Sequence, residues 1–387
     1  MGIGGFIDSI SSLFKGNTQQ ENEFKSGNVP ENNSKILAAD FGSSSFKLLN
    51  GYKKNGEIKI SGLNTVPSDS AMSRISYFEN VSAEIEAFKT KIEILTANFS
   101  AEADNLIVSL PDNFSFINLI SLDKVPSEEA FNEVIKSCLE PDLPHSYNLW
   151  QVASQVIDKT AKSCNVITLS TLKKNYDTIV KVMNSVIAEP DYISASAFLA
   201  HEAVYPYLEK NAEKNIAVIG LGNVTTMVSI FKGQNLRFMQ NVYIGGYNFT
   251  LDIANSHHIA TLEAESLKRN ELFFLPEYAP QQEKIQNFTL IKASFMELMR
   301  GIFCFFESYL NKYFEPKIDE IIIYGGGANF KNIDVMMNGL LNMPVRKSSS
   351  IVKADFVNGQ PLDEDSVNLY LPLIGAVRGG VSNEGKA

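Results

Sequence analysis

The chain has 387 residues, enough for two domains with separate cores, and 44% of its residues are hydrophobic, as in globular proteins. Its formal net charge is -10 and its basic residues form no cluster, which argues against nucleic acid as a partner. It has no run of about 18 apolar residues and no CxxC pair. We therefore expect a soluble protein of a reducing cytoplasm, without a disulfide framework or zinc site.

An apolar helical face is predicted at the start of the chain. Within residues 1–16, the large apolar side chains recur at the spacing of one helical face. They are Ile3, Phe6, Ile7, Ile10, Leu13 and Phe14. The polar stretch that follows, up to residue 34, is typical of a flexible tether. The helix is expected to dock on a membrane surface or a partner, or to fold back onto the protein itself; its polar face lacks the basic residues of a lipid-binding helix.

A strand at residues 35–39 leads into a loop of small residues at 40–45. Strand-like runs at 46–52 and 57–65 follow, joined by a tight turn at 53–56. Glycine and serine allow consecutive backbone N–H groups to point into one concavity, which can bind phosphate oxygens. The pattern therefore predicts a β-hairpin unit that carries a phosphate-binding loop.

The next elements alternate between helix and strand. A helix is predicted at 82–98 and a buried strand at 105–110. Residues 114–165 then alternate strand-like and helix-like pieces, which indicates an inserted subdomain. A buried strand at 165–169 and helices at 172–186 and 191–205 are then expected to return the chain to the main sheet.

The second half of the chain repeats the plan of the first. A strand at 215–219 leads into a glycine-bearing loop at 220–226, and strands at 227–231 and 236–244 follow. The fold is therefore predicted to be duplicated, with two phosphate-binding loops that could clamp one polyphosphate. A third glycine signal follows the strand at 320–324, where three successive glycines would let the backbone lie flat against a planar ligand.

Five motifs occur in the order found in actin-fold ATPases, at residues 40–47, 222–226, 245–254, 264–268 and 325–328. Over about residues 35–380 the chain resembles the type IV pilus assembly protein PilM family, with the cell-division protein FtsA as its nearest competitor. The resemblance implies an α/β, actin-like fold, that is, a duplicated ribonuclease H-like fold with two lobes around a nucleotide cleft. The expected parts are the N-terminal segment and tether at 1–34, a first lobe at 35–210 with a small α+β subdomain inserted at about 114–165, a second lobe at 211–380 with a helical insertion at about 250–318, and a flexible tail at 381–387.

The resemblance implies ATP and Mg²⁺ as ligands, and it implies which residues bind them. The residues implied are Gly42, Ser43, Ser44, Ser45 and Lys47 for the first phosphate loop, Gly222, Asn223, Val224, Thr225 and Thr226 for the second, Glu265 and Lys268 for the ribose and adenine edge, and Gly325, Gly326, Gly327 and Asn329 around the adenosine. Asp40 matches the acidic residue that holds magnesium through its water shell.

One position departs from the superfamily pattern. The second phosphate loop usually begins with an aspartate that places Mg²⁺ or the attacking water, and here Gly220 stands there. Loss of such a carboxylate typically costs orders of magnitude in phosphoryl transfer. We therefore expect nucleotide binding with little or no hydrolysis, unless another carboxylate substitutes from elsewhere.

The resemblance also implies a partner and a place. It favours a cytoplasmic scaffold, peripheral at the inner membrane, that grips the N-terminal peptide of a PilN-type bitopic protein with residues of about 114–165. Other pilus platform proteins or motor ATPases are further candidate partners. The alternatives are an FtsA-like division protein or filament-forming actin homologue and, less favoured, a small-molecule kinase of the same fold.

Overall fold

The computed structural model describes residues 34–68, 85–97, 99, 102–124, 126–159, 163–270 and 281–380. The predicted N-terminal docking helix, nearly all of its tether and the tail at 381–387 lie outside the described residues. The chain forms two compact units. Among the described residues, unit 1 comprises those up to Tyr205, Lys353–Leu362 and those from Pro372 on, and unit 2 comprises those in Pro206–Val352 and Asp363–Leu371. Two of the points where the chain passes between units fall inside a helix, at Pro206 and at Pro372.

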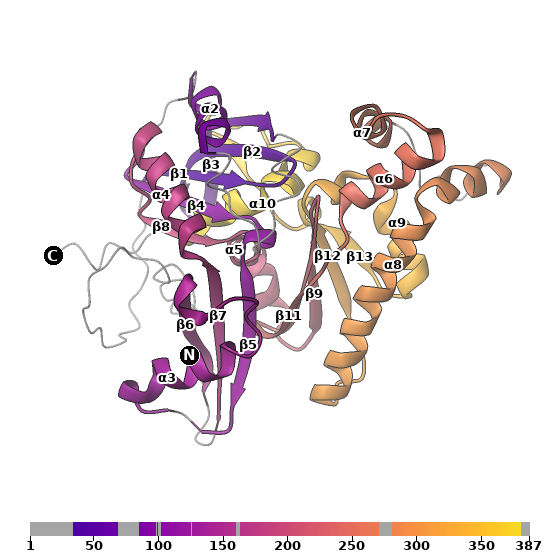
Figure 1. Ribbon diagram of the computed structural model, residues 1–387. Coiled ribbons are helices and arrows are strands. Elements are labelled where there is room, and N and C mark those ends of the chain that lie inside the picture. The colour runs from indigo at the N-terminus through magenta and orange to yellow at the C-terminus, as the bar shows by residue number, and fades with distance from the viewer. Residues whose placement is uncertain are drawn as a thin grey trace. The chain divides into compact units, whose positions relative to one another are not determined.

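Unit 1 is built on a six-stranded sheet in the order β14-β3-β2-β1-β4-β8 (Figure 1). Its strands are β1 (Ile36–Phe41), β2 (Ser45–Lys54), β3 (Glu57–Pro67), β4 (Asn105–Leu110), β8 (Tyr192–Ala195) and β14 (Asp355–Phe356). Every residue of β1 is buried, because this strand lies inside the sheet between antiparallel β2 and parallel β4. Its helices are α2 (Ile85–Thr96), α3 (Glu128–Leu139), α4 (Lys173–Val186), the first part of α5 (Ser196–Lys210) and the last part of α10 (Glu364–Gly379).

The turn between β2 and β3 shows how local sequence produces this sheet. Asn55 and Gly56 both have positive φ, 52° and 80°. A two-residue hairpin with this geometry matches the twist of the flanking strands, and Asn-Gly is the pair that adopts it most readily. The turn predicted at residues 53–56 is therefore confirmed.

Unit 1 also contains a smaller antiparallel sheet in the order β5-β7-β6, with α3 beside it (Figure 1). Its strands are β5 (Phe116–Leu122), β6 (Trp150–Lys159) and β7 (Cys164–Leu172). The strand expected at 165–169 is part of β7, so the expectation that it belongs to the main sheet is wrong; its pairing with β5 and β6 decides its place. Ile135 and Leu139 of α3 share a buried cluster with Trp150 and Val166 of this sheet. The small sheet therefore has a hydrophobic core of its own.

One predicted element is wrong at its start. The sequence predicted a helix from residue 191 to residue 205, but the structure has strand β8 first and begins α5 only at Ser196. β8 pairs in parallel with β4, from Ile107↔Tyr192 to Leu110↔Ala195. Pairing with a distant strand overrides the helical pattern of the short segment, which local sequence cannot show.

Unit 2 is built on a five-stranded sheet in the order β11-β10-β9-β12-β13 (Figure 1). Its strands are β9 (Asn215–Leu221), β10 (Thr226–Lys232), β11 (Asn235–Val242), β12 (Glu320–Tyr324) and β13 (Val345–Lys347), and its helices include α6 (Gly246–His257), α7 (Thr261–Asn270), α8 (Gln281–Tyr313) and α9 (Ile333–Leu341). One side of the long helix α8 packs on the sheet, where Phe295, Phe306 and Tyr309 are buried.

The two main sheets share one plan, as the duplication in the sequence predicted. The order β3-β2-β1-β4 in unit 1 corresponds to β11-β10-β9-β12 in unit 2. In each, the first strand is antiparallel to its hairpin partner and parallel to the strand on its other side. The actin-like α/β architecture expected from the sequence is therefore present.

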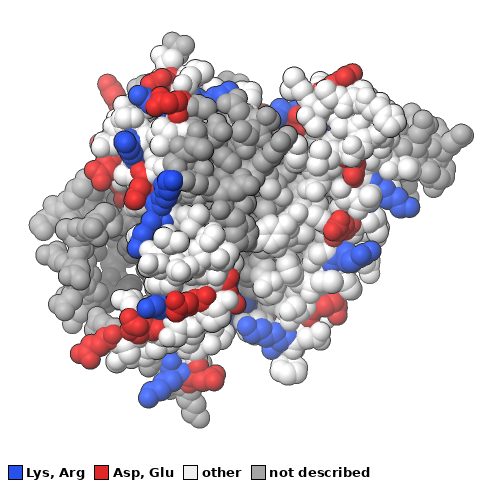
Figure 2. All heavy atoms as spheres, viewed as in Figure 1, with Lys and Arg blue, Asp and Glu red and all other residues white. Residues whose placement is uncertain are grey.

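The described residues include no helix that is both long and apolar enough to span a membrane. On the face shown in Figure 2, acidic and basic side chains of the described residues are interspersed.

Candidate functional site

Asp40 lies near the end of β1, where three strands bring polar side chains together. It is register-paired with Lys47 of β2 and with Ser109 of β4. Its Oδ2 forms an ion pair with Lys47 Nζ, and its Oδ1 accepts a hydrogen bond of 2.8 Å from Ser109 Oγ. All three residues are buried. Both carboxylate oxygens therefore have donors, which is the condition under which a buried charge is tolerated.

The loop after β1 leaves little room for a side chain at Gly42. A Cβ atom on Gly42 would lie 3.0 Å from the carbonyl oxygen of Ser45, three residues further on. The loop is also held from outside: Ser68 Oγ donates to the carbonyl oxygen of Ser43 at 2.6 Å, and Ser68 N donates to that of Ser44 at 3.1 Å. The sequence did not single out Ser68, because nothing local marks it as a partner of this loop.

Asp112 is a second carboxyl near this loop that the sequence analysis missed. It begins the short turn that follows β4. Its residue is partly exposed, but its Oδ1 is buried and is reached by no hydrogen-bond donor among the described residues. Burial raises the pKa of Asp112 to about 7; a hydrogen bond from the Ala197 backbone opposes this shift, and the charge of Asp40 adds to it.

The glycine of the second loop has even less room for a side chain than that of the first. A Cβ atom on Gly222 would lie 2.6 Å from the carbonyl oxygen of Thr225, again three residues further on. Gly222 N donates to that same oxygen at 3.1 Å. Thr226 is fully buried and its Oγ1 donates to the carbonyl oxygen of Ile244 at 2.8 Å. The Thr226 hydroxyl thus holds the loop, and its contact with a nucleotide stays a prediction.

The second loop is fixed to the start of α6. The amides of Gly246 and Tyr247 donate to the carbonyl oxygens of Gly222 and Asn223, at 2.9 and 2.7 Å. A Cβ atom on Gly245 would lie 2.6 Å from the Asn223 carbonyl, so the close approach requires glycine there. Two of the amides that a helix leaves free at its start are thus already used. Val224, between these contacts and Thr225, is half-buried.

Lys268 forms a buried network between α7 and α6. Its Nζ lies 2.5 Å from Glu265 Oε2, 2.8 Å from Thr250 Oγ1 and 2.9 Å from the carbonyl oxygen of Gly246. An ammonium has three N–H donors, so each of them has an acceptor. Lys268 therefore holds the two helices together; it offers no spare donor to a ligand in this arrangement.

Glu265 is the more accessible partner of this pair. Its side chain is 25% exposed, against 6% for that of Lys268, and its Oε1 also accepts a 2.9 Å contact from Arg269 Nε. Burial alone would raise the pKa of Glu265, but the Lys268 charge and the hydrogen bonds from Lys268, Thr250 and Arg269 lower it. Burial lowers the pKa of Lys268, and Glu265 opposes that shift. Sequence spacing alone would suggest a surface ion pair, whereas the structure buries Lys268.

The three glycines after β12 differ in what surrounds them. Gly325 has a φ of 87°, and its Cβ would lie 2.8 Å from the carbonyl oxygen of Leu221. A Cβ on Gly327 would lie 2.7 Å from the Leu221 Cβ, whereas one on Gly326 would come no closer than 3.9 Å to any neighbour, namely Leu369 Cδ1. Gly325 and Gly327 are thus needed to pack the turn on β9, and Gly326 has open space beside it.

Asn329 is held by the first part of α10. Its Nδ2 donates to the carbonyl oxygen of Asp365 at 2.9 Å, and its Oδ1 accepts from Asn368 Nδ2 at 3.0 Å. Asn368, which is fully buried, also accepts at its Oδ1 from Ser348 Oγ and Ser349 N, at 2.8 and 2.9 Å. Asn368 therefore holds Asn329, at the end of the glycine turn, to the segment at Ser348 and Ser349. No motif in the sequence pointed to Asn368.

The described acidic, histidine and cysteine side chains do not form a site that binds a metal ion by protein groups alone. The described part of the chain contains no group of three or more His, Cys, Asp or Glu residues that could hold a metal ion. Asp40 has both oxygens engaged, but carboxylate oxygens can accept more than one hydrogen bond. This fits a magnesium ion that arrives with phosphate groups and meets Asp40 through water, which is how magnesium is commonly bound with nucleotides.

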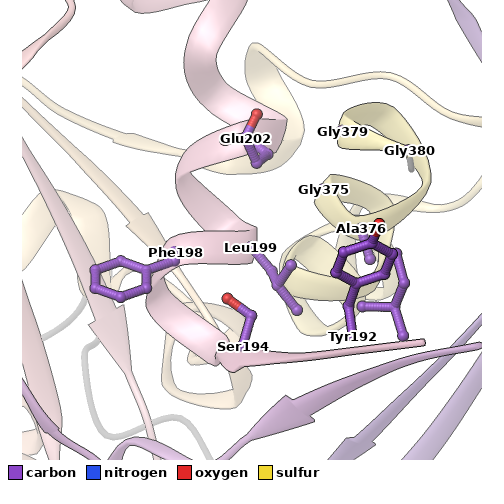
Figure 3. Close-up of a pocket in the computed structure, with 10 residues that line it drawn as sticks. Tyr192, Ser194, Phe198, Leu199, Glu202, Gly375, Ala376, Gly379 and Gly380 are labelled. Carbon is purple, nitrogen blue, oxygen red and sulfur yellow. The ribbon is translucent and has the colours of Figure 1, made fainter. Parts of the chain in front are cut away.

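A separate hollow in unit 1 involves none of the predicted site residues. It lies between β4, β8, α5 and the end of α10, and Figure 3 shows its lining. Glu202 supplies the only charged side chain among the lining residues, and Tyr192, Phe198 and Leu199 supply much of the apolar surface. A Cβ on Gly375 would lie 1.7 Å from the carbonyl oxygen of Leu199, so α10 can approach α5 only because this residue is glycine.

Two kinds of comparison relate this chain to known proteins. The family model described as type IV pilus assembly protein PilM matches residues 38–367. A solved PilM–PilN type IV pilus biogenesis complex has a chain that matches with a TM-score of 0.74 at 15% identity, over 90% of this chain and 99% of that chain. MreB 5 of Spiroplasma citri, solved with bound AMPPNP, matches with a TM-score of 0.50 at 12% identity, over 89% of this chain and 95% of its own. Among curated protein sequences, none matches.

Proposed function

Because the chain belongs to the type IV pilus assembly protein PilM family, we propose that it acts in pilus assembly as an ATP-binding, actin-like scaffold at the cytoplasmic side of the inner membrane. One observation carries the nucleotide assignment. In each half, the loop after the first strand has a glycine whose Cβ would lie unusually close to the carbonyl oxygen three residues on, at 3.0 Å for Gly42 and at 2.6 Å for Gly222. Two equivalent loops with this shared constraint are suited to approach phosphate groups closely. The AMPPNP bound to the MreB relative supports the same assignment.

The proposed roles follow from the contacts. The loop at residues 42–45 with Lys47 takes one part of the phosphate chain, and the loop at residues 222–226 takes another. Glu265, the more exposed member of its network, accepts hydrogen bonds from the ribose hydroxyls, and Lys268 holds Glu265 in place. The open side of Gly326 lies against the adenosine.

We propose further that the bound nucleotide is hydrolysed slowly or not at all. Gly220 stands where the superfamily usually has an aspartate, and the only protein group that we assign to the magnesium ion is Asp40. Without a carboxylate to place the ion or the attacking water, transition-state stabilisation falls by orders of magnitude. Binding of ATP then orders the protein for a partner, which is a coupling between two sites rather than a catalytic step.

The partner proposed is the cytoplasmic N-terminal peptide of a PilN-type bitopic membrane protein. The solved relative is a PilM–PilN complex, which supports this choice. The small sheet β5-β7-β6 with α3 is proposed as the peptide-binding part, because it forms a distinct module with its own core. The match to the PilM family favours this function over an FtsA-like filament or a small-molecule kinase.

A matched pair of glycine variants tests the nucleotide site. Gly326→Val adds a side chain on the open side of the glycine turn, and Gly339→Val makes the same change in α9, where no atom lies within 4 Å of the added Cβ. Titration with a fluorescent ATP analogue should show at least about tenfold weaker binding for Gly326→Val, since a blocked contact of about 1.4 kcal/mol has this effect. Gly339→Val should bind as the wild type does. Equal affinity in all three proteins would contradict the assignment.

The partner is tested with the same protein. A labelled peptide of the N-terminus of the PilN-type protein from the same source is titrated with the full chain, with and without Mg²⁺-ATP, and anisotropy is measured. Tighter binding in the presence of Mg²⁺-ATP is expected. Equal peptide affinity with and without Mg²⁺-ATP would show that nucleotide and peptide binding are not coupled. Absence of peptide binding would show that this peptide is not the partner.

A further inference from the structure

Gly220 and Tyr324 are direct neighbours in the sheet of unit 2. Gly220 lies near the end of β9 and Tyr324 ends β12, and the two are register-paired in a parallel arrangement. A Cβ atom on Gly220 would lie 2.6 Å from both Cζ and Oη of Tyr324 and 3.1 Å from its Cε1. Carbon atoms do not pack at 2.6 Å, so the tyrosine ring fills the space in which a side chain at 220 would begin.

The position of the ring follows from strand pairing. Register-paired residues point their side chains to the same face of a sheet, and a glycine there leaves a gap that an aromatic neighbour can cover. Tyr324 is only 4% exposed. The residue after it, Gly325, is packed against the Leu221 carbonyl, which fixes the strand end that carries the ring. A side chain at 220 thus requires the ring to leave a buried position.

We propose that Tyr324 determines the chemistry of the second phosphate loop by excluding every side chain, and hence a carboxylate, from position 220. This rests on the proposed function, since it explains why the loop binds a nucleotide without positioning magnesium or water for hydrolysis. Tyr324 is then a positioning residue, because its buried ring acts through the space that it occupies and not through contact with the nucleotide. The Tyr324 ring occupies the space of a side chain at position 220, so replacing Gly220 with an acidic residue alone would not place a carboxylate there.

The pairing is tested first by stability, with no nucleotide present. Gly220→Ala adds one methyl group against the ring and should lower the melting midpoint by about 1–4 °C, as overpacking of about 1–3 kcal/mol does in a protein of this size. In a Tyr324→Ala background the same substitution should lower it by less than about 0.5 °C, because the space has been vacated. Gly339→Ala, which meets no atom within 4 Å, is the control and should not lower the midpoint. An equal effect of Gly220→Ala in both backgrounds, or no effect in the wild type, would overturn the pairing.

The chemical consequence is tested with Gly220→Asp, alone and combined with Tyr324→Ala. Affinity for a non-hydrolysable ATP analogue is measured with Mg²⁺ and with EDTA, and phosphate release from ATP is measured in a single turnover. For the combined variant, the ratio of the affinity with Mg²⁺ to the affinity with EDTA should be at least about tenfold higher than for the wild type. A carboxylate at position 220 would supply the kind of ligand that this ion prefers. Gly220→Asp alone should gain little.

The remaining outcomes separate this inference from the proposed function. If Gly220→Asp alone matches the combined variant in magnesium dependence, Tyr324 does not exclude the side chain. If the combined variant folds and binds the analogue without magnesium dependence, position 220 does not face the ion, and the chemical part is wrong. If the wild type binds no ATP analogue, the proposed function fails, while the melting experiment still decides whether Tyr324 closes position 220.

Discussion

At the scale of single residues, several polar groups can be buried because they form hydrogen bonds and ion pairs with one another. Lys268 is satisfied by Glu265, Thr250 and the carbonyl oxygen of Gly246. Asp40 is satisfied by Lys47 and Ser109. Such groups stabilise best as complete sets, since removal of one member leaves a buried polar group of the set with fewer partners.

Replacement of Lys268 therefore affects folding as well as binding. Lys268→Met should lower the free energy of unfolding by about 1–3 kcal/mol, because Glu265 would keep a partly buried charge without its main partner. Arg269→Met removes the exposed partner of Glu265 and should cost about 0–1 kcal/mol. Urea unfolding followed by circular dichroism measures both. If Lys268→Met costs as much in a Glu265→Gln background as in the wild type, the two residues are not coupled.

Asp112 should make stability depend on pH in a defined direction. Its pKa is about 7 in the folded protein and 3.8 in an exposed carboxyl. Between these values the folded state binds the extra proton, so stability falls as pH rises from about 4 to 7, and the full cost is present above pH 7. Asp112→Asn keeps an oxygen for the Ala197 amide and removes the charge. It should therefore be more stable than the wild type by about 1–3 kcal/mol at pH 8, and the difference should shrink towards pH 5.

Chemical unfolding at pH 5, 6, 7 and 8 measures this dependence. Asp123→Asn, at an exposed position, is the matched control. A stability gain for Asp112→Asn that is the same at every pH would show that the gain does not come from ionisation of Asp112.

At the scale of elements, glycines decide which pieces can approach one another. Gly375 brings the last part of α10 to within contact of the Leu199 carbonyl on α5, and Gly245 brings the start of α6 to Asn223. Both helices would be displaced by one methyl group at these places. The same residue type has no such role at Gly339, where the space beside the helix is open.

The two helical glycines therefore predict opposite effects of one substitution. Gly375→Ala should lower the free energy of unfolding by at least about 1–3 kcal/mol, because its Cβ would overlap the Leu199 carbonyl. Gly339→Ala should raise it by about 0.5–1 kcal/mol, because alanine loses less backbone entropy in a helix. Thermal and urea unfolding of the two variants provide the test. A neutral Gly375→Ala would mean that α5 and α10 are not held this closely in solution.

At the scale of the whole molecule, the duplicated sheet gives each unit a glycine loop at the same topological position. Gly42 follows β1 and Gly222 follows β9, and each loop is braced by its own unit: the first by Ser68, the second by the start of α6. Each loop is therefore fixed within its own unit; for the nucleotide binding proposed above, such fixed loops would lose little entropy on binding.

If the protein binds ATP in its folded state, ATP must stabilise it. At a concentration of about 100 times the dissociation constant, the expected gain is about 2.7 kcal/mol. Melting curves with increasing Mg²⁺-ATP should shift upward in the wild type and in Gly339→Val, and much less in Gly326→Val. Equal shifts for the two valine variants would show that the stabilising site does not include Gly326.

The sequence by itself determined the duplicated order of strands and loops and the glycines of the loops after β1 and β9, because these are consequences of short repeats and of hairpins between neighbouring strands. The tertiary structure alone decided which distant residues complete them. Ser109 reaches Asp40 across 69 positions, and Tyr324 covers Gly220 from a strand that follows a long helix. Strand β8 likewise forms only because β4 is available to pair with it. Such partners are chosen by sheet order and register, which long-range packing sets and no local pattern encodes.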